Sequence, residues 1–423
     1  MFSQSKTKTI NKERNIDFDR RIMLFDLALG GHHGNYIKYL IDYWCQYDLP
    51  GFLDIVVAPE FSQVHTDVVE SIAGYQHPKI ELIEIKDSER ATANFKKSAI
   101  SRAIRNLQEW ELYCYYAKSR QTTSALLMYL DTSEIPLVIG RKSPCPFSGI
   151  YFRPSFHYSK FSNYQPSWKD RLQQIREKLA LRRILSHPQL QNIFCLDPFA
   201  VESLRHNSDR TQVSYLADPV EIEQFTPKDA QLSQLNLKIE SGRTVFLMLG
   251  ALDERKGVYR LLDALNDMST NICRQICLLF IGGTNLTEQA KIKQRLQEIV
   301  RNKPLQVIEE YKFIPDWQVR SYFQLADVVL APYQKHVGMS GILIRAAAAG
   351  KPVLSSNYGL MGEMVRQYDL GMTIDSSLPK EIERGIRQYL TTNPKQFGDR
   401  SKMLEFARQN SVENYVNTIF NNI

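Results

Sequence analysis

Short apolar runs and segments with helical periodicity alternate along most of the chain. In the first half, strands are expected at 22–29, 52–58, 80–85, 125–130, 137–139 and 193–196, and helices at 35–47, 94–116 and 168–185. Apolar runs of this length are typical of buried strands, and helices of this length between them connect parallel strands. The pattern predicts an α/β fold with a parallel sheet covered on both faces.

The second half repeats this scheme more plainly. Strands are expected at 244–249, 276–281, 305–310, 327–331 and 352–355, and helices at 258–268, 288–302, 316–325, 341–349 and 378–390. Proline and aspartate interrupt the pattern at Leu216-Ala217-Asp218-Pro219. We therefore expect a flexible N-terminus at 1–20, domains at 21–215 and 216–398, and a helix at 399–423 that crosses back onto the first domain.

Composition narrows the class of protein. The chain has 423 residues, of which 43% are hydrophobic and 23% charged, so it fits two globular domains and excludes a disordered chain or a disulfide scaffold. No apolar stretch approaches the roughly 20 residues of a membrane span, and residues 1–20 lack the apolar core of a signal peptide. A cytoplasmic protein with reduced thiols is expected, because its six cysteines are scattered and the Cys273–Cys277 spacing is a poor zinc signature.

Positive charge is concentrated in the first domain. Residues 91–190 hold 16 Lys and Arg against 6 Asp and Glu. The cations gather on two expected helices, as Lys96, Lys97, Arg102 and Arg105 on one and Arg171, Arg176, Lys178, Arg182 and Arg183 on the other. These helices are either solvated faces or a peripheral contact with an anionic membrane surface. Nucleic acid is not an expected partner, since no recognition motif is present.

Three glycine-containing loops follow expected strands. Gly250 to Gly257 places Arg255 and Lys256 just before a helix, where unpaired N–H groups and two cations suit a diphosphate. Ser340 and Gly341 begin an alanine-rich helix, with Ser340 expected as its N-cap. Gly30-Gly31-His32-His33-Gly34 follows the first strand, but it is not the full dinucleotide fingerprint, so NAD is not expected. Taken singly, the first two loops fit a solvated turn and a capped structural helix equally well.

Together these segments resemble glycosyltransferase family 4. The resemblance covers 244 to about 375 and rests on segments 250–257, 281–283, 326–333, 346–353 and 359–365 with Gly371, in the family's order and spacing. It implies the GT-B fold, in which two doubly wound Rossmann-like domains face each other across a cleft. The N-terminal domain would bind the acceptor and the C-terminal domain the nucleotide sugar.

The resemblance also assigns donor-site residues. Arg255 and Lys256 would bind the donor diphosphate, Gly31 would approach it from the other domain, and the backbone at Ser340, Gly341 and Ile342 would complete the site. The donor would be a UDP- or GDP-linked sugar, without metal or other cofactor. Asp17-Phe18-Asp19 resembles a metal-binding motif, but it precedes the first strand and is expected to be solvated.

The sequence departs from the family at two positions. Family members carry two glutamates eight positions apart, and here those positions hold Val337 and Arg345, neither of which accepts hydrogen bonds as a carboxylate does. Contacts to the donor sugar or nucleoside are therefore assigned to His336, Arg345 and Glu363. Glu363 lies ahead of an expected helix, so a helix-capping role is equally open.

Candidate catalytic residues lie on the acceptor side. His33 is preferred over His32 for orienting an acceptor hydroxyl, although a packed loop histidine fits equally well. Asp131 follows an expected strand at the same sheet edge, where it either acts on the acceptor or forms a structural turn. The resulting hypothesis is a retaining, metal-independent hexosyltransferase (EC 2.4) that uses a saccharide or lipid-linked acceptor in polysaccharide or glycolipid assembly. A peripheral position on the cytoplasmic membrane face would suit such an acceptor. The alternatives are a non-catalytic nucleotide-sugar sensor or scaffold, and an epimerase of similar shape whose carboxylates are not found.

Overall fold

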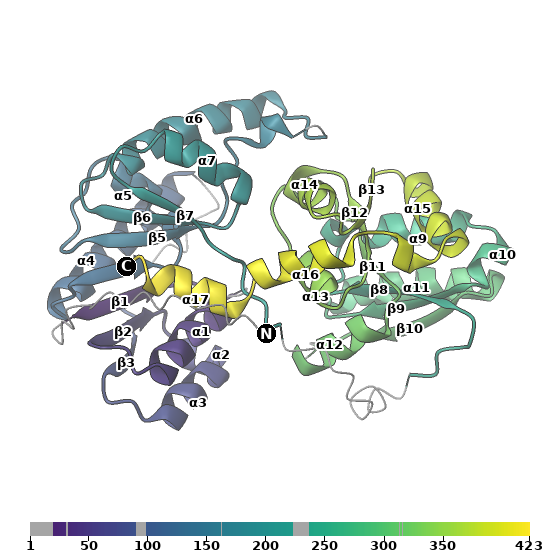
Figure 1. The fold of residues 1–423 in the computed structure, drawn as a ribbon, viewed down its shortest axis with the longest axis horizontal. Coiled ribbons are helices and arrows are strands. Elements are labelled where there is room, and N and C mark those ends of the chain that lie inside the picture. The colour runs from purple at the N-terminus through teal and green to yellow at the C-terminus, as the bar shows by residue number, and fades with distance from the viewer. Residues whose placement is uncertain are drawn as a thin grey trace, which may run out of the picture.

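Two parallel sheets, each covered by helices on both faces, form two domains (Figure 1). The computed structural model describes residues 20–30, 33–89, 99–161, 163–222, 237–312, 314 and 316–423. The strands of the N-terminal domain lie in the order β3-β2-β1-β4-β5-β6-β7. Their bounds are β1 Arg21–Asp26, β2 Phe52–Val57, β3 Ile80–Glu84, β4 Ser124–Leu127, β5 Phe147–Tyr151, β6 Leu190–Cys195 and β7 Gln212–Tyr215.

Alternate residues of the central strands pack against opposite helical layers. In β1, Ile22 and Leu24 belong to one apolar cluster and Met23 and Phe25 to the other, because successive side chains point to opposite faces. The first layer holds α1 His33–Gln46, α2 Phe61–Val64, α3 Thr66–Tyr75 and α17 Val412–Phe420, and the second holds α4 Ala99–Ser119, α5 Glu134–Val138, α6 Trp168–Leu185 and α7 Pro198–His206. Burial on both faces explains why these strands are almost wholly apolar.

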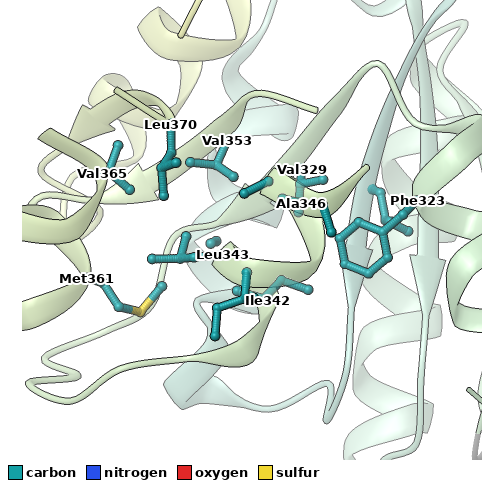
Figure 2. Packing of buried hydrophobic residues seen from close by; sticks show 14 of the residues in the cluster. Phe323, Val329, Ile342, Leu343, Ala346, Val353, Met361, Val365 and Leu370 are labelled. Carbon is teal, nitrogen blue, oxygen red and sulfur yellow. The ribbon is translucent and has the colours of Figure 1, made fainter. Parts of the chain in front are cut away.

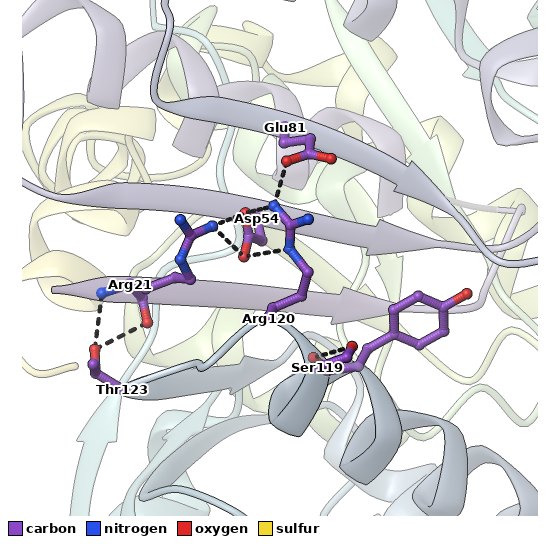
Figure 3. A network of polar contacts seen from close by, with 7 residues as sticks. Arg21, Asp54, Glu81, Ser119, Arg120 and Thr123 are labelled. Atoms are coloured by element: carbon purple, nitrogen blue, oxygen red, sulfur yellow. Dashed lines mark hydrogen bonds and ion pairs between the residues drawn. The ribbon is translucent and has the colours of Figure 1, made fainter. Parts of the chain in front are cut away.

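Asp54 places a buried carboxylate within this apolar sheet. Asp54 of β2 is 1% exposed and lies between two guanidinium groups (Figure 3). Arg21 donates to its two oxygens at 2.9 and 3.0 Å, and Arg120 donates to them at 3.1 Å while also pairing with Glu81. Two hydrogen-bonded cations compensate the desolvated charge, so this group ties β1, β2 and the end of α4 together.

The C-terminal domain has six strands in the order β10-β9-β8-β11-β12-β13. Their bounds are β8 Thr244–Leu249, β9 Ile276–Ile281, β10 Gln306–Glu310, β11 Val328–Ala331, β12 Val353–Ser356 and β13 Gly371–Ile374. The helices are α9 Val258–Asp267, α10 Thr270–Cys273, α11 Leu286–Asn302, α12 Asp316–Leu325, α13 Gly341–Ala348, α14 Gly359–Gln367, α15 Pro379–Thr391 and α16 Arg400–Gln409. In both sheets the strand order reverses beside the first strand, which is where ligands bind in doubly wound folds.

Small side chains let α13 approach its sheet closely. Leu343 and Ala346 pack against Val329 of β11 and Val353 of β12, with Phe323 of α12 beside them (Figure 2). All five are buried. The packing fixes the start of α13 at the carboxyl edge of the sheet.

The chain crosses between the domains twice, at neighbouring positions. The first crossing follows β7, and the second joins α16 to α17. Val220 donates its backbone N–H to the carbonyl of Asn410 at 3.0 Å, and Tyr215 donates its hydroxyl to the Asn410 side chain at 3.0 Å. Beyond the second crossing, α17 packs against α1, where the hydroxyl of Tyr43 donates to Asn417 at 2.6 Å. The end of the chain thus forms two helices, one against each domain (Figure 1).

One strand prediction is wrong. Residues 137–139, expected as a strand, form the end of α5 and the turn after it. The strand in this region is β5 at Phe147–Tyr151, which the sequence pattern did not predict. Within the described residues, no helix is both long and apolar enough to cross a bilayer.

Candidate functional site

The loop after β8 contains the two cations expected to bind a diphosphate. Asp253 accepts a hydrogen bond from the backbone N–H of Lys256 at 2.8 Å, which fixes a short 3₁₀ turn at Glu254–Lys256. Gly257 follows with φ 83°, and a Cβ there would lie 2.0 Å from the carbonyl oxygen of Pro332. Only glycine permits this close approach, so the loops after β8 and β11 are held together at the carboxyl edge of the sheet.

Lys256 is half-buried against Tyr333 of the neighbouring loop. Its ammonium nitrogen lies 4.1 Å from the Tyr333 ring centroid and donates to the Tyr333 hydroxyl. The hydroxyl of Tyr333 lies 3.0 Å from the Ser340 Oγ. This chain of contacts joins the lysine to the N-terminus of α13, where backbone N–H groups favour anions.

Burial and charge act together on Lys256. Burial, reinforced by the adjacent Arg255, lowers the pKa of Lys256 from 10.5 to about 8. Arg255 itself is exposed, with its guanidinium 5.8 Å from the Tyr333 ring centroid. A half-buried cation beside a second cation, with no ion pair to an acidic side chain among the described residues, would be stabilised by a bound anion.

The start of α13 differs from the prediction in one respect. Ser340 occupies the N-cap position, but its side chain makes no capping hydrogen bond and pairs with Tyr333 instead. The expected side-chain cap is therefore wrong, because the tyrosine hydroxyl competes for the serine. A Cβ built on Gly341 would meet nothing within 4 Å, so the space before the helix is open. Ile342, the next residue, is buried in the core.

His336 lies beside the same group. Its Nε2 is 3.1 Å from the carbonyl oxygen of Met339, and its ring centroid is 5.5 Å from that of Tyr333. Burial lowers the pKa of His336, and Arg255, Lys256 and Arg153 lower it further. Arg153 follows β5, so a cation of the N-terminal domain acts electrostatically on a histidine of the C-terminal domain.

The other donor-side candidates lie elsewhere. Arg345 lines a small cavity with Tyr39 and Phe323, near the domain crossing. Glu363 lies inside α14, whose N-cap is Tyr358, and it forms an ion pair with Arg366 at 2.6 Å. The capping role considered for Glu363 is wrong, because the helix begins four residues earlier. Gly31, His32 and the 17–19 segment lie outside the described residues.

On the acceptor side, His33 is held by a buried carboxylate. Its Nδ1 lies 2.6 Å from Oδ2 of Asp26, which ends β1 and is 3% exposed. The imidazole stacks on Phe152 with ring centroids 5.8 Å apart, and Tyr129 meets it edge-on at 5.5 Å. The carboxylate thus orients the ring, as in a catalytic Asp–His pair. Asp26 was missed in the sequence, although an acidic residue at the carboxyl end of the first strand is a signal for it.

Asp131 lies on the other side of Phe152. It accepts the Phe152 backbone N–H at 3.0 Å, and burial raises its pKa from 3.8 to about 6. It lines a cavity of about 220 Å³ with Glu134, Arg153 and Glu177, among other residues. His33 therefore contacts the ring of Phe152, and Asp131 contacts its backbone. The next residue, Arg153, influences His336 of the C-terminal domain, so this end of the sheet faces that domain.

The loop between β5 and α6 connects the two halves of the site. Its Tyr158 and Phe161 pack in the core of the C-terminal domain, and the ring centroids of Tyr164 and Tyr358 are 5.4 Å apart. Within the described residues, no group of three or more His, Cys, Asp or Glu side chains is arranged to hold a metal ion. The described residues thus form a cationic site in the C-terminal domain and a His–carboxylate pair in the N-terminal domain.

The fold is of the GT-B class, with two Rossmann-like domains. Sucrose-phosphate synthase from Thermosynechococcus elongatus has a similar fold, with a TM-score of 0.65 at 15% identity over 95% of this chain and 98% of that one. Anabaena HepE in complex with UDP gives a TM-score of 0.64 at 12% identity, with 95% and 98% covered.

Sequence comparison is more specific for the C-terminal half. Residues 231–410 match the family model for glycosyl transferases group 1. A curated relative, the lipopolysaccharide 1,2-N-acetylglucosaminetransferase of Salmonella typhimurium, is 26% identical over 190 residues, which are 43% of this chain and 48% of that protein. The chain thus spans about half the length of the curated relatives it matches.

Proposed function

We propose that the protein is a glycosyltransferase that moves a sugar from a nucleoside diphosphate to an acceptor hydroxyl without a metal ion. The observation that carries this proposal is the Lys256–Tyr333–Ser340 chain at the N-terminus of α13. It brings a cation and a hydroxyl to the start of a helix, where backbone N–H groups favour anions. The group 1 match over the same residues supports it.

In this proposal the C-terminal domain stabilises the leaving group. When the bond between the anomeric carbon and the diphosphate oxygen breaks, the electron pair stays on the diphosphate. Lys256 in its protonated form, together with Arg255, offsets that charge, and preorganised cations act strongly in a half-buried site. HepE, a protein of similar fold, was crystallised with UDP, so a uridine nucleotide is the first donor to test.

The N-terminal domain would present the acceptor. The acceptor oxygen attacks the anomeric carbon, and its proton passes to a diphosphate oxygen if configuration is retained. His33, fixed by Asp26, would orient that hydroxyl, and Asp131 would bind a neighbouring hydroxyl of the acceptor. With a pKa of about 6, Asp131 is mainly ionised at pH 7 and accepts such a hydrogen bond.

A panel of nucleotide sugars tests the proposal. The protein is incubated with each UDP-, GDP- and ADP-sugar, and release of the nucleotide is measured with and without simple glycoside acceptors. Thermal shifts with the free nucleotides give the base preference, because a ligand of the folded state raises its melting temperature. Release from at least one donor, lost in Arg255→Ala, is expected; the absence of both binding and release for every nucleotide would contradict the proposal.

A non-catalytic nucleotide-sugar sensor is the second candidate. The observation that favours it is Val337, which stands in the loop after β11 where the resembled family has a glutamate. Its side chain is apolar, and its backbone carbonyl accepts the Leu360 N–H at 2.9 Å. Measurable binding of a nucleotide sugar with no turnover under any acceptor would select this function instead.

A further inference from the structure

Helix α6 exposes a stripe of large apolar side chains. Trp168, Leu172, Ile175 and Leu179 are 68%, 57%, 56% and 60% exposed. At about 100° per residue, their spacing places them within an arc of roughly 60° on one side of the helix. The opposite side is the one that enters the core, through Ala180, Leu181, Ile184 and Leu185. The helix is therefore apolar on two faces, and nothing among the described residues covers the face that carries the stripe.

Cations border the stripe on both sides. The helix contains six, namely Lys169, Arg171, Arg176, Lys178, Arg182 and Arg183. The same projection places three on each flank of the stripe. All six are exposed, so together they form a positively charged surface around an apolar centre.

Both acidic residues of α6 project away from the stripe and accept hydrogen bonds. Asp170 accepts from the backbone and side chain of Ser167 in a capping box. Glu177 accepts from the Tyr151 hydroxyl at 2.5 Å and from the Ser155 backbone N–H at 2.8 Å. The outward face is thus free of acidic side chains, and its composition complements an anionic surface.

The stripe continues into a groove between α6, α5 and α4. The groove has a volume of about 960 Å³ and is lined by Ile139, which is 57% exposed, and by Arg102 of α4. Asp131 and Glu134 also line it, and Asp131 belongs at the same time to the smaller cavity next to the candidate acceptor site. The apolar surface therefore leads to the acceptor side.

We propose that α6 docks flat on an anionic lipid bilayer, with its apolar stripe in the interface and its flanking cations on the lipid headgroups. Cations on both sides of a tryptophan-containing stripe are typical of helices that lie in the plane of a membrane. Figure 1 shows α6 along the outer edge of the N-terminal domain, where a planar surface can reach it. A second part of the inference rests on the proposed function: the docked protein would take its acceptor from the bilayer through the groove.

Vesicle binding tests the docking without any nucleotide. The full chain is sedimented with phosphatidylcholine vesicles and with vesicles that contain about 30% phosphatidylglycerol. Binding is expected only to the anionic vesicles, and it should weaken as salt rises. Trp168→Ser with Leu172→Ser should reduce binding at least tenfold. Lys178→Gln, Arg182→Gln and Arg183→Gln together should reduce it roughly 100-fold, at about 1 kcal/mol per cation.

Matched variants on the other domain serve as controls. Leu286→Ala with Leu378→Ala removes apolar side chains that are 84% and 51% exposed. Lys380→Gln, Arg384→Gln and Arg387→Gln remove three exposed cations from α15. Both controls should bind like the unaltered protein. Equal binding of the stripe variant and the unaltered protein would overturn the inference, as would equal binding to both kinds of vesicle.

Two further measurements distinguish membrane docking from self-association of the chain and from the proposed function. If the stripe mediates contact between copies of this chain, sedimentation velocity will show a dimer that the stripe variant dissociates, and the membrane inference fails. Nucleotide release with a soluble acceptor and no vesicles should be equal in the stripe variant and the unaltered protein. Lost vesicle binding with intact release supports the docking, whereas absent release with intact vesicle binding contradicts only the proposed function.

Discussion

Lys256→Met should weaken diphosphate binding while leaving the fold as stable as before or more so. The pKa of Lys256 falls from 10.5 to about 8, and 1.36 kcal/mol per pH unit converts this into about 3 kcal/mol. The folded state bears that penalty for a protonated lysine at pH 7. Methionine keeps the apolar contact with Tyr333 without the charge, so the apparent melting temperature without ligand should not fall.

The loss of binding follows from the same cation. A hydrogen bond to a charged group contributes about 1.5–3 kcal/mol, so removal of the ammonium should weaken UDP binding roughly 10- to 100-fold. A stabilised protein that has lost its ligand is the expected signature of a residue placed for binding rather than for folding.

The pH dependence gives a sharper test. Protonated Lys256 binds the diphosphate, and the free protein loses this proton as pH rises through about 8. UDP affinity should therefore change by less than about twofold from pH 6.5 to 7.5 and fall about fivefold between pH 8 and 9. Tyr333, with its pKa raised by burial to about 12, and His336, with its pKa lowered, do not titrate in this interval.

Isothermal titration calorimetry with UDP measures both effects. The matched control is Lys351→Met, because burial lowers the pKa of this lysine too, although it precedes β12 at the opposite edge of the sheet and donates to the carbonyl of Gln324 at 2.9 Å. The control should keep the affinity and its pH dependence. An affinity that stays level from pH 7 to 9 in the unaltered protein would refute the reasoning.

Three other variants follow from the site. Arg255→Ala should weaken UDP binding about tenfold by calorimetry with no change in melting temperature, because the side chain is exposed. Asp131→Asn should lower kcat and leave UDP affinity unchanged; in the unaltered protein kcat should rise as pH passes about 6, where the carboxyl ionises, and the variant should lack this rise. Gly257→Ala should lower the melting temperature and UDP affinity together, because its Cβ would lie 2.0 Å from the Pro332 carbonyl oxygen at a φ of 83°; unchanged values for both would show that the two loops can separate.

Strong periodicity predicted most of the fold. The strands at 244–249 and 276–281 and the helix at 168–185 agree with the structure residue for residue. The type of a short element is harder to predict, because a run of three to five apolar residues fits a strand or a helix turn equally well. The missed strand β5 contains Ser148 and Gly149, which break its apolar run, although both are buried.

Residues of the candidate site could be selected from the sequence only where they belong to a local motif. Arg255, Lys256 and Ser340 could be selected from glycine loops and helix starts. The contact of Lys256 with Tyr333, and the pairing of His33 with Asp26, depend on which loops meet at the sheet edge. Such contacts join residues that are 77 and 7 positions apart, and no local pattern encodes the first of them.

The double crossing between the domains limits how they can move. Two polypeptide connections run side by side at Val220 and Asn410, joined by a backbone hydrogen bond. A single tether would let one lobe swivel freely about the other, whereas paired tethers remove most of that freedom and leave rotation about the line on which they meet. A rotation of this kind would change the distance between Arg153 and His336, which belong to different domains.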